Sequence, residues 1–497
     1  TFTFAADDSL DNTDIIDGGD GTDTLTANLA ADGGVTKTPN MENIEIFQVK
    51  NTDATGSEDI ATYNLINTAS TFTTLWNDNS TDSVTFSNLN AVPGLVKLSL
   101  AVGTTTVNYV GTSLTGTADS QAVELYGTSG TTLALTGGST LLARVIETVT
   151  IKSDSVANTL ADLQTTGVGT TALTLTGPKG LTITAALDSE IATIDASGMT
   201  GAVGLTLGTS PGITTGVTIT GSPGADVLYG AAGNDNISSG AGNDSINLGT
   251  VQTYDTVDGG AGTDTIVATA TIASDTVFAG LSNVETLSLS GAINVTLTAA
   301  TQTFATISTA DANNNTVVLD SSYMGGTGAQ TVIMTTDADS GDTITNSAGV
   351  TLTVIANTAD LAGNTNTTIT TGAVDLTDEL ILTMTGAGEL GTNGGNNQIT
   401  GFDKITIADA VTGNTASTLG LGDYATALTI DASALDATDG ALTITGANVS
   451  KAITYTGGAG ADIVTGGAAA DNLSGGAGAD ALTGTAGANT LDGGAGA

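Results

Sequence analysis

The feature that most constrains the fold is a nine-residue repeat of the form Gly-Gly-x-Gly-x-Asp-x-U-x, in which U is a large aliphatic residue. A short fixed period indicates coils that stack on their neighbours, because one such unit cannot bury its own apolar side chain. The repeats fall into three blocks, at 9–26, 221–267 and 457–492, and the second block contains a two-residue insertion. These blocks therefore predict three stretches of stacked coils.

Each repeat combines a turn, a charge and a core residue. Glycine accepts positive φ without a steric penalty, so the first half of the repeat can turn tightly with its carbonyl oxygens pointing inward. The Asp adds a carboxylate, and the aliphatic residue two positions later fills the core. Calcium prefers about six to eight oxygen ligands from carboxylates and backbone carbonyls. The blocks therefore predict several bound calcium ions.

Stacking determines which aspartates can share an ion. Two repeats make one coil, so every second loop lies on the same side. This geometry pairs Asp226 with Asp244, Asp235 with Asp255, Asp244 with Asp264, Asp462 with Asp480, and Asp471 with the uncharged Asn489. In the first block only Asp14 and Asp23 occupy the expected position. The predicted metal ligands are therefore Asp14, Asp23, Asp226, Asp235, Asp244, Asp255, Asp264, Asp462, Asp471, Asp480 and Asn489.

The charge balance also favours bound cations. The chain has 51 acidic and 8 basic residues, a formal net charge of −43. Self-repulsion of this size opposes compaction unless cations neutralise it. Disorder is a poor explanation, because 39% of the residues are hydrophobic. The same field would repel nucleic acid, and no long apolar run predicts a membrane span. Neither nucleic-acid binding nor membrane insertion is expected.

The composition argues against an enzyme. The chain has no His and no Cys, which excludes imidazole bases, thiol nucleophiles and the zinc-protease motif. A Gly-x-Ser-x-Gly string at 208–212 resembles a hydrolase nucleophile elbow, but Pro211 has no N–H for an oxyanion hole. We interpret this string as a turn. A carboxylate pair for glycoside hydrolysis stays open, although no pair stands out.

The segments between the blocks have the pattern of β-strands. Apolar residues alternate with Thr in 173–176 and 181–184, and clusters of Gly, Asn, Asp and Ser follow such runs as turns do. Only Asn158 to Gln164 could hold one or two turns of helix. Many short strands and 3% aromatic residues indicate a solenoid or stacked sandwiches rather than one large globular core.

A second, longer period divides the chain into two related modules. Asn-Ile-Glu at 43–45 and Asn-Val-Glu at 283–285 follow the first two blocks, and Thr-Ile-Asp-Ala-Ser recurs at 193–197 and 429–433. The predicted domains are the end of an upstream block (1–42), a β-rich module (43–220), a calcium block (221–282), a second β-rich module (283–456) and a truncated calcium block (457–497). Both ends look cut, so the chain is expected to be part of a longer polypeptide.

Several polar residues lie outside the regular repeats. Glu45 and Glu285 are placed to bond either a loop or an ion beside a block, and the sequence does not distinguish these roles. Asp195 and Asp431, inside the Thr-Ile-Asp-Ala-Ser segments, are interpreted as turn or register residues. Trp76, the only Trp, is interpreted as a strand or packing residue.

Two degenerate segments resemble repeats that have lost part of the motif. The segment 325–333 has Gln330 where the Asp should be, and 337–345 keeps Asp342 but has lost most of its glycines. We interpret both segments as relics of the solenoid.

These residues resemble a known family. The nonapeptides are similar to those of RTX proteins exported by type I secretion. The Glu-marked strands at 43–47 and 283–287, together with the Thr-Ile-Asp-Ala-Ser segments, resemble the surface-layer (S-layer) proteins of Gram-negative bacteria. The resemblance implies an all-β, right-handed parallel β-roll or β-solenoid, with Thr-rich strand modules between the RTX calcium blocks.

The resemblance also implies a function. The chain would be secreted unfolded, fold on binding extracellular calcium and self-assemble into a two-dimensional lattice on the cell surface. Its partners would be copies of itself and, through a region outside this sequence, lipopolysaccharide or another surface glycan. The alternative is an RTX adhesin or extracellular matrix fibre. Two divergent modules favour a lattice subunit, whereas many near-identical modules would favour a fibre.

Overall fold

The structure is a computed structural model, and it consists almost entirely of β-strands. The described residues are 1–5, 10–29, 34–52, 60–69, 71–110, 113–114, 118–137, 146–165, 168–209, 216–249, 255–272, 274–298, 304–309, 314–323, 329–334, 341–357, 367–372, 377–383, 388–390, 398–409, 416–424 and 426–496. Within them the one helix is a 3₁₀ helix, η1 (Asp275–Gly280). The chain divides into two compact units.

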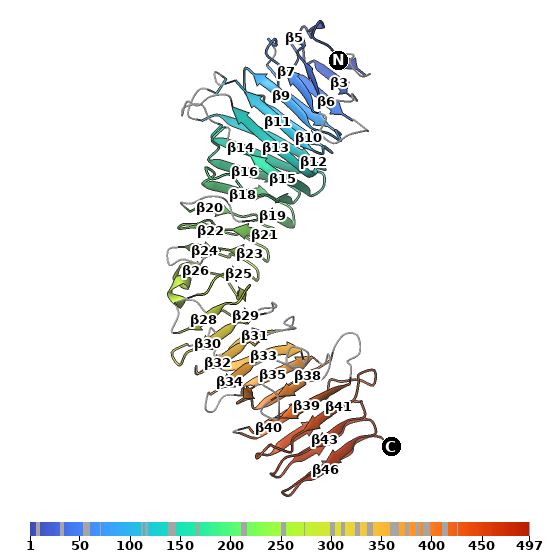
Figure 1. The fold of residues 1–497 in the computed structure, drawn as a ribbon, viewed down its shortest axis with the longest axis vertical. Coiled ribbons are helices and arrows are strands. Elements are labelled where there is room, and N and C mark those ends of the chain that lie inside the picture. Colours follow the sequence, from blue (N-terminus) through green and yellow to red (C-terminus); the bar gives the residue numbers. More distant parts are fainter. Residues whose placement is uncertain are drawn as a thin grey trace. The chain divides into compact units, whose positions relative to one another are not determined.

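The first unit comprises Thr1–Gly249, Tyr254–Asp264 and Leu281–Asn283, and it contains two long parallel ladders (Figure 1). Ladder one is β1 (Phe2–Phe4), β3 (Thr24–Leu29), β6 (Ile46–Asn51), β8 (Thr74–Asp78), β10 (Leu95–Ser99), β12 (Ser120–Tyr126), β14 (Thr148–Asp154), β16 (Ala172–Gly177), β18 (Thr193–Met199), β20 (Thr218–Thr220), β22 (Asn236–Ser238), β24 (Thr256–Asp258) and β26 (Leu281–Ser282). Ladder two is β4 (Val35–Lys37), β7 (Ala61–Asn64), β9 (Val84–Leu89), β11 (Thr104–Tyr109), β13 (Ser129–Gly137), β15 (Asn158–Gln164), β17 (Leu181–Ile183), β19 (Val203–Leu207), β21 (Ala225–Tyr229) and β23 (Ser245–Asn247). A separate pair joins β2 (Ile15–Asp17) to β5 (Asn40–Glu42).

The second unit comprises Thr250–Thr253, Thr265–Gly280 and Val284–Ala497, and its ladders are also parallel. Its long ladder is β25 (Thr265–Ala268), β27 (Thr286–Leu289), β29 (Thr306–Ser308), β31 (Ala329–Ile333), β33 (Thr351–Asn357), β35 (Glu379–Thr383), β38 (Lys404–Ala408), β40 (Leu428–Asp431), β42 (Ile453–Thr456), β44 (Asn472–Ser474) and β46 (Thr490–Asp492). Two shorter ladders are β28 (Asn294–Leu297), β30 (Thr316–Leu319), β32 (Thr343–Asn346), β34 (Thr368–Thr371) and β37 (Gln398–Thr400), and then β36 (Gly388–Leu390), β39 (Ser417–Leu421), β41 (Leu442–Thr445), β43 (Ile463–Thr465) and β45 (Ala481–Thr483).

Consecutive strands alternate between ladders within each unit, which is the arrangement of a stacked-coil β-solenoid. The expected all-β parallel solenoid is therefore confirmed. Asn158–Gln164 is strand β15 rather than helix. Ala161 is an extra residue there, because Leu160 pairs with Thr131 and Asp162 with Thr132. This bulge puts the two buried leucines of β15 three positions apart, a spacing that looks helical in the sequence.

Columns of aliphatic side chains form the core. Each strand buries alternate residues, so in-register pairing stacks the buried ones directly above each other. One column in the first unit is Val149, Leu173, Ile194, Ile219, Ile237 and Val257, each at most 1% exposed. Burying each such side chain stabilises the fold by about 1.5–3 kcal/mol. The column joins Thr-rich strands to strands of the second block, so both segment types share one core.

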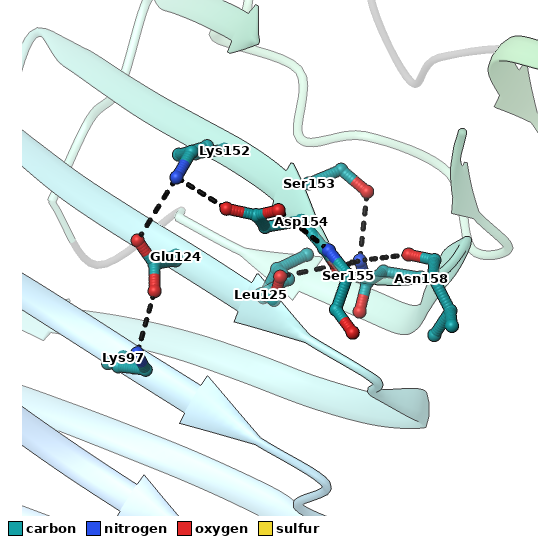
Figure 2. Close-up of polar contacts among 9 residues, drawn as sticks. Lys97, Glu124, Leu125, Lys152, Ser153, Asp154, Ser155 and Asn158 are labelled. Carbon is teal, nitrogen blue, oxygen red and sulfur yellow. Dashed lines mark hydrogen bonds and ion pairs between the residues drawn. The ribbon is translucent and has the colours of Figure 1, made fainter. Parts of the chain in front are cut away.

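The outer face of ladder one carries charges in rows across the strands (Figure 2). Glu124 lies between Lys97 and Lys152 with N–O distances of 2.8 and 3.5 Å, and Lys152 also pairs with Asp154. Lys97 Nζ lies 4.9 Å from the centre of the Trp76 ring. Trp76 is thus a strand residue on the outer face of β8, as the sequence predicts, and its Nε1 donates to Ser99 Oγ at 2.9 Å.

Candidate metal centre

The predicted ligands occupy one structural position. The sixth residue of each repeat lies immediately before a strand or, for Asp226, one residue inside it. We call this position the corner residue, because the chain turns there from a loop into a strand. In the second and third blocks the corner residue reaches back to the coil before it.

In the second block the structure brings together all three predicted pairs. The backbone N–H of Asp226 donates to Asp244 Oδ1 at 2.8 Å. Asp235 N–H donates to Asp255 Oδ1 at 3.1 Å, and Asp244 N–H donates to Asp264 Oδ1 at 2.8 Å. All five aspartates are at most 2% exposed. The result is a ladder of buried carboxylates at the corners of successive coils.

The third block repeats this geometry. Asp462 N–H donates to Asp480 Oδ1 at 2.8 Å, and Asp471 N–H donates to Asn489 Oδ1 at 2.9 Å. The amide of Asn489 thus makes the same hydrogen bond without bringing a charge. The ladder also continues into the preceding coil, where Leu442 N–H donates to Asp462 Oδ1 at 3.0 Å.

The first block differs, because its two aspartates do not face each other. Asp14 Oδ2 accepts the N–H of Asp11 at 2.8 Å within its own turn. Asp23 N–H donates to Glu45 Oε2 at 2.7 Å. Glu45 therefore bonds the loop of the block, which is one of the two roles that the sequence left open for it.

The first glycine of a repeat makes room for the corner carboxylate. A Cβ on Gly221 would lie 2.7 Å from Asp226 Oδ2, and one on Gly457 would lie 2.9 Å from Asp462 Oδ2. Gly478, at φ +130°, packs directly on the carbonyl of Gly460. Only glycine tolerates this close stacking, so the loops bring carbonyl oxygens and a carboxylate into a small space.

The metal-free carboxylates are incompletely compensated. Burial raises the pKa of Asp226, Asp244 and Asp462, and it raises the pKa of Asp235 to about 6. Hydrogen bonds to these carboxylates lower their pKa values, but burial has the larger effect. A cation at these corners would supply the missing charge.

The second carboxylate oxygen shows where a cation would fit. Oδ2 of Asp226 and of Asp471 accepts an N–H from its own loop, at 2.6 and 2.8 Å. By contrast, Oδ2 of Asp244 and of Asp480 is buried without a hydrogen-bond partner. In the described residues no three acidic side chains converge on a metal-binding cluster. An ion beside Asp244 or Asp480 would therefore take most of its ligands from the carbonyls of the glycine loops, which suits calcium.

A comparison with known protein families identifies these segments. The family described as RTX calcium-binding nonapeptide repeat (4 copies) matches residues 10–32, 218–249, 254–270, 454–482 and 474–497. The three blocks are RTX repeats. Repeats of this kind occur in several copies and bind several calcium ions. The matched segments contain every predicted ligand position. Which of these side chains ligate an ion stays a prediction.

No curated protein matches the chain significantly. The described part of the chain has no helix with the length and apolar character that crossing a membrane requires. RTX repeats are typical of secreted proteins, and a β-solenoid of such repeats is typical of structural or adhesin proteins.

Residues singled out outside the blocks have mainly local roles. Asp195 Oδ1 accepts the N–H and hydroxyl of Ser197 at 3.0 and 2.6 Å, and Asp431 bonds Ser433 in the same way. Asp431 ends β40 and is thus a turn residue, whereas Asp195 lies inside β18 where the register shifts, so the prediction of turn or register residues agrees with both. The carbonyl of Glu285 accepts the N–H of Ala305 at 2.8 Å. Residues 210–212 of the Gly-x-Ser-x-Gly string, and 325–328 and 337–340 of the degenerate repeats, lie outside the described residues.

Gln330 shows how a corner can close without a charge. Its Oε1 accepts the hydroxyl of Tyr323 at 2.7 Å, and its Nε2 donates to the carbonyls of Thr331 and Ala305 at 3.0 and 3.4 Å. Gln121 makes equivalent bonds, including one from the hydroxyl of Tyr109 at 2.7 Å. These buried amides provide the hydrogen bonds at the corner without bringing a charge.

The sequence analysis missed other corner residues in the Thr-rich modules. Glu147 Oε2 accepts the N–H of Asp119 at 2.7 Å, the same bond that Glu45 makes with Asp23. The shared Ile-Glu pair at 44–45 and 146–147 could have identified Glu147. Asp342, the Asp that the degenerate repeat 337–345 retains, accepts the N–H of Asn315 at 2.6 Å, and Asp378, which the sequence did not mark, accepts the N–H of Leu352 at the same distance. No nonapeptide surrounds Asp378, so no sequence pattern marked it.

Proposed function

We propose that this RTX calcium-binding protein is a structural S-layer subunit that folds on binding extracellular calcium and self-assembles into a two-dimensional lattice. The observation that carries the folding step is the ladder of buried carboxylates in the second and third blocks. Without metal these charges are buried close together, which opposes folding. With metal, the free energy of calcium binding becomes free energy of folding. A calcium-poor cytosol would then keep the RTX blocks unfolded, which would favour export by type I secretion.

A cluster of exposed apolar side chains supports self-assembly. Leu100 and Val102 follow β10, Tyr126 ends β12 and Val156 follows β14, with exposed fractions of 53%, 48%, 44% and 53%. A Cβ placed on Gly127 would meet both Leu100 and Val156, so these turns are neighbours. We call these four residues the apolar ridge. Contiguous exposed apolar groups are typical of interaction sites, and we assign this ridge to contact with a second copy of the chain.

The role is proposed to be structural rather than enzymatic, since the chain has no His or Cys. Attachment to a surface glycan such as lipopolysaccharide is proposed for a region outside this sequence. The second candidate function is an RTX adhesin or matrix fibre, which the calcium ladder supports equally well. Assembly behaviour separates the two functions.

The test combines circular dichroism and light scattering during a calcium titration from excess chelator. The proposal expects a steep, reversible rise in β-signal near about 10⁻⁴–10⁻³ M calcium, the affinity range of extracellular calcium modules. Scattering from ordered sheets should follow. A β-signal that rises without assembly would favour the adhesin or fibre. A β-signal indifferent to chelator would contradict calcium-driven folding.

A substitution in the ridge tests the assembly step separately. Val156→Asp should abolish the scattering increase and leave the calcium-dependent β-signal unchanged. Ile66→Asp is the matched control, because Ile66 is 54% exposed and follows β7 in ladder two, away from the ridge. Loss of assembly in both variants, or in neither, would contradict the assigned contact.

A further inference from the structure

One corner column in the second unit runs from the Thr-rich module into the third block. Successive strand pairings place Gln330, Leu352, Asp378 and Asp403 above one another. The same register continues through Leu428 and Ile453 to Asp471 and Asn489 of the RTX block. A residue in this column can therefore be compared directly with a corner residue of a calcium repeat.

Asp378 has the features of an RTX corner aspartate. It lies immediately before β35 and is 1% exposed. Its Oδ1 accepts the N–H of Leu352 at 2.6 Å, as Asp471 Oδ1 accepts the N–H of Ile453 at 2.9 Å. Its Oδ2 is buried without a hydrogen-bond partner, like Oδ2 of Asp480. Asp378 nevertheless lies outside every segment that matches the RTX repeat.

Two further oxygen-bearing side chains lie beside Asp378. Thr371, the last residue of β34, is 8% exposed, and its Oγ1 is also buried without a hydrogen-bond partner. Burial raises the pKa of Asp378, and the nearby Thr371 hydroxyl lowers it to a smaller extent. Asp403, on the next coil, approaches with its Oδ2 3.4 Å from the N–H of Asp378. Two buried oxygens without partners therefore lie at this corner, and the Asp403 carboxylate contacts the backbone of Asp378 from the next coil.

No lysine neutralises this corner in the described residues. Lys404 follows Asp403, but its Nζ pairs with Glu379 Oε1 at 2.8 Å. Glu379 and Lys404 are paired across β35 and β38, next to Asp378 and Asp403 in sequence but on the opposite side of the strand. Gln330 occupies the same position two coils earlier in the column. The neutral amide of Gln330 needs no compensating charge, whereas the carboxylate of Asp378 does.

We propose that Asp378, with Thr371 and Asp403, holds a calcium ion outside the RTX repeats. Two side-chain carboxylates and a hydroxyl are hard oxygen ligands of the kind that calcium takes, with the remaining ligands supplied by backbone carbonyls and water. Calcium binding at this site would stabilise the Thr-rich module over the same range of conditions in which calcium stabilises the RTX blocks. This proposal does not depend on lattice assembly.

The test counts calcium ions bound to the full chain by equilibrium dialysis, for the unaltered protein and for Asp378→Asn. The Asn amide can still accept the Leu352 N–H, as Asn489 accepts that of Asp471, but it removes the charge. The variant should bind one calcium ion fewer. Asp320→Asn is the control, because the partly exposed Asp320 carboxylate bonds its own turn through Ser322, and its count should not change. An unchanged count in Asp378→Asn would overturn the proposal.

A second variant and a second measurement keep the proposal testable if Asp378→Asn folds poorly. Thr371→Val keeps the size of the side chain and removes its oxygen, so it should weaken the affinity of one ion by about tenfold, or 1.4 kcal/mol. In excess chelator, Asp378→Asn should unfold at higher urea than the unaltered protein, because it removes an uncompensated buried charge. In excess calcium it should unfold at lower urea. The same shift in both conditions would overturn the proposal.

Discussion

At the scale of single residues, the two oxygens of a corner carboxylate have separate tasks. Oδ1 closes the coil by accepting a backbone N–H of the preceding coil, which an amide does equally well at Asn489. Oδ2 is either bonded within its own loop, as in Asp471, or left without a partner, as in Asp480. The first oxygen therefore fixes the register of the coils, and the second determines the need for a cation.

The raised pKa of Asp235 predicts how the metal-free protein responds to pH. A carboxyl whose folded pKa of about 6 exceeds its ordinary value of 3.8 stabilises the fold below the ordinary value. This stability is lost as the pH rises through 6. In chelator, the β-signal should therefore increase on acidification from pH 7 to pH 4. Asp235→Asn should flatten this dependence, and a metal-free protein that loses structure on acidification would contradict it.

Calcium affinity should change with pH in the opposite direction. Calcium competes with protons for the same carboxylates, so binding should strengthen as the pH rises from 5 to 7. Isothermal titration calorimetry in buffers of different ionisation enthalpy would detect the protons released on binding. Binding without proton release across this range would show that the buried carboxylates are already ionised before calcium arrives.

Two glycines at the same repeat position predict different effects of one substitution. A Cβ on Gly475 would fall on Asp480 Oδ2, whereas a Cβ on Gly493 would have no atom within 4 Å. Gly475→Ala should raise the calcium midpoint of folding at least about tenfold, equivalent to 1.4 kcal/mol. Gly493→Ala should leave the midpoint unchanged. Equal shifts would mean that these glycines act through chain entropy rather than through space for the carboxylate.

At the scale of secondary structure, neutral polar groups hold several Thr-rich strands of the first unit. Asn158 at the start of β15 is 1% exposed, and its Oδ1 accepts the N–H of Thr128 at 2.9 Å. Its Nδ2 donates to the hydroxyl of Ser153 and to neighbouring carbonyls, including that of Leu125 (Figure 2). One side chain thus joins the turn that follows β12 to the turn that follows β14 without an ion.

Removal of this amide should destabilise the first unit regardless of calcium. Asn158→Ala leaves buried backbone groups unsatisfied, at a cost of about 1–3 kcal/mol for each group. Gln164→Ala is the matched control, because exposed Gln164 ends the same strand and bonds only Asp162. Urea unfolding in chelator and in calcium should show the same loss for Asn158→Ala. A loss confined to calcium-loaded protein would show that this corner is metal-linked.

The sequence predicted those elements whose spacing is constant. A nine-residue period fixes which corner residues stack, so the pairs Asp226 with Asp244 and Asp462 with Asp480 could be deduced by counting. Coil length varies in the modules, so counting could not place Asp378 beside Asp403. The bulge in β15 similarly made a strand look helical in the sequence, because it spaces the two buried leucines three positions apart. The hydrogen bonds of a turn involve neighbouring residues, so the turn at Asp431 could be predicted from the sequence.

At the scale of the whole molecule, the chain combines coils with two kinds of corner. Charged corners with unpartnered oxygens occur in the RTX blocks, whereas the Thr-rich strands from β8 to β15 contain corners closed by amides and hydroxyls beside the charged corner of Glu147. The shared aliphatic columns hold both kinds in one core, so the neutral coils can remain folded beside a metal-free block. Folding by calcium is therefore expected to extend an existing solenoid rather than start one.

Hydrogen exchange in chelator and in calcium measures this difference directly. In chelator, the amides of β9, β11, β13 and β15 should stay protected, because their hydrogen bonds do not require a metal. Those of β22, β23, β44 and β45 should exchange rapidly, because buried carboxylates repel one another there, and calcium should restore their protection. Uniform exchange of all these strands in chelator would mean that the Thr-rich coils need the calcium blocks to fold. The neutral corners would then only fix register, and calcium would control folding of the entire chain.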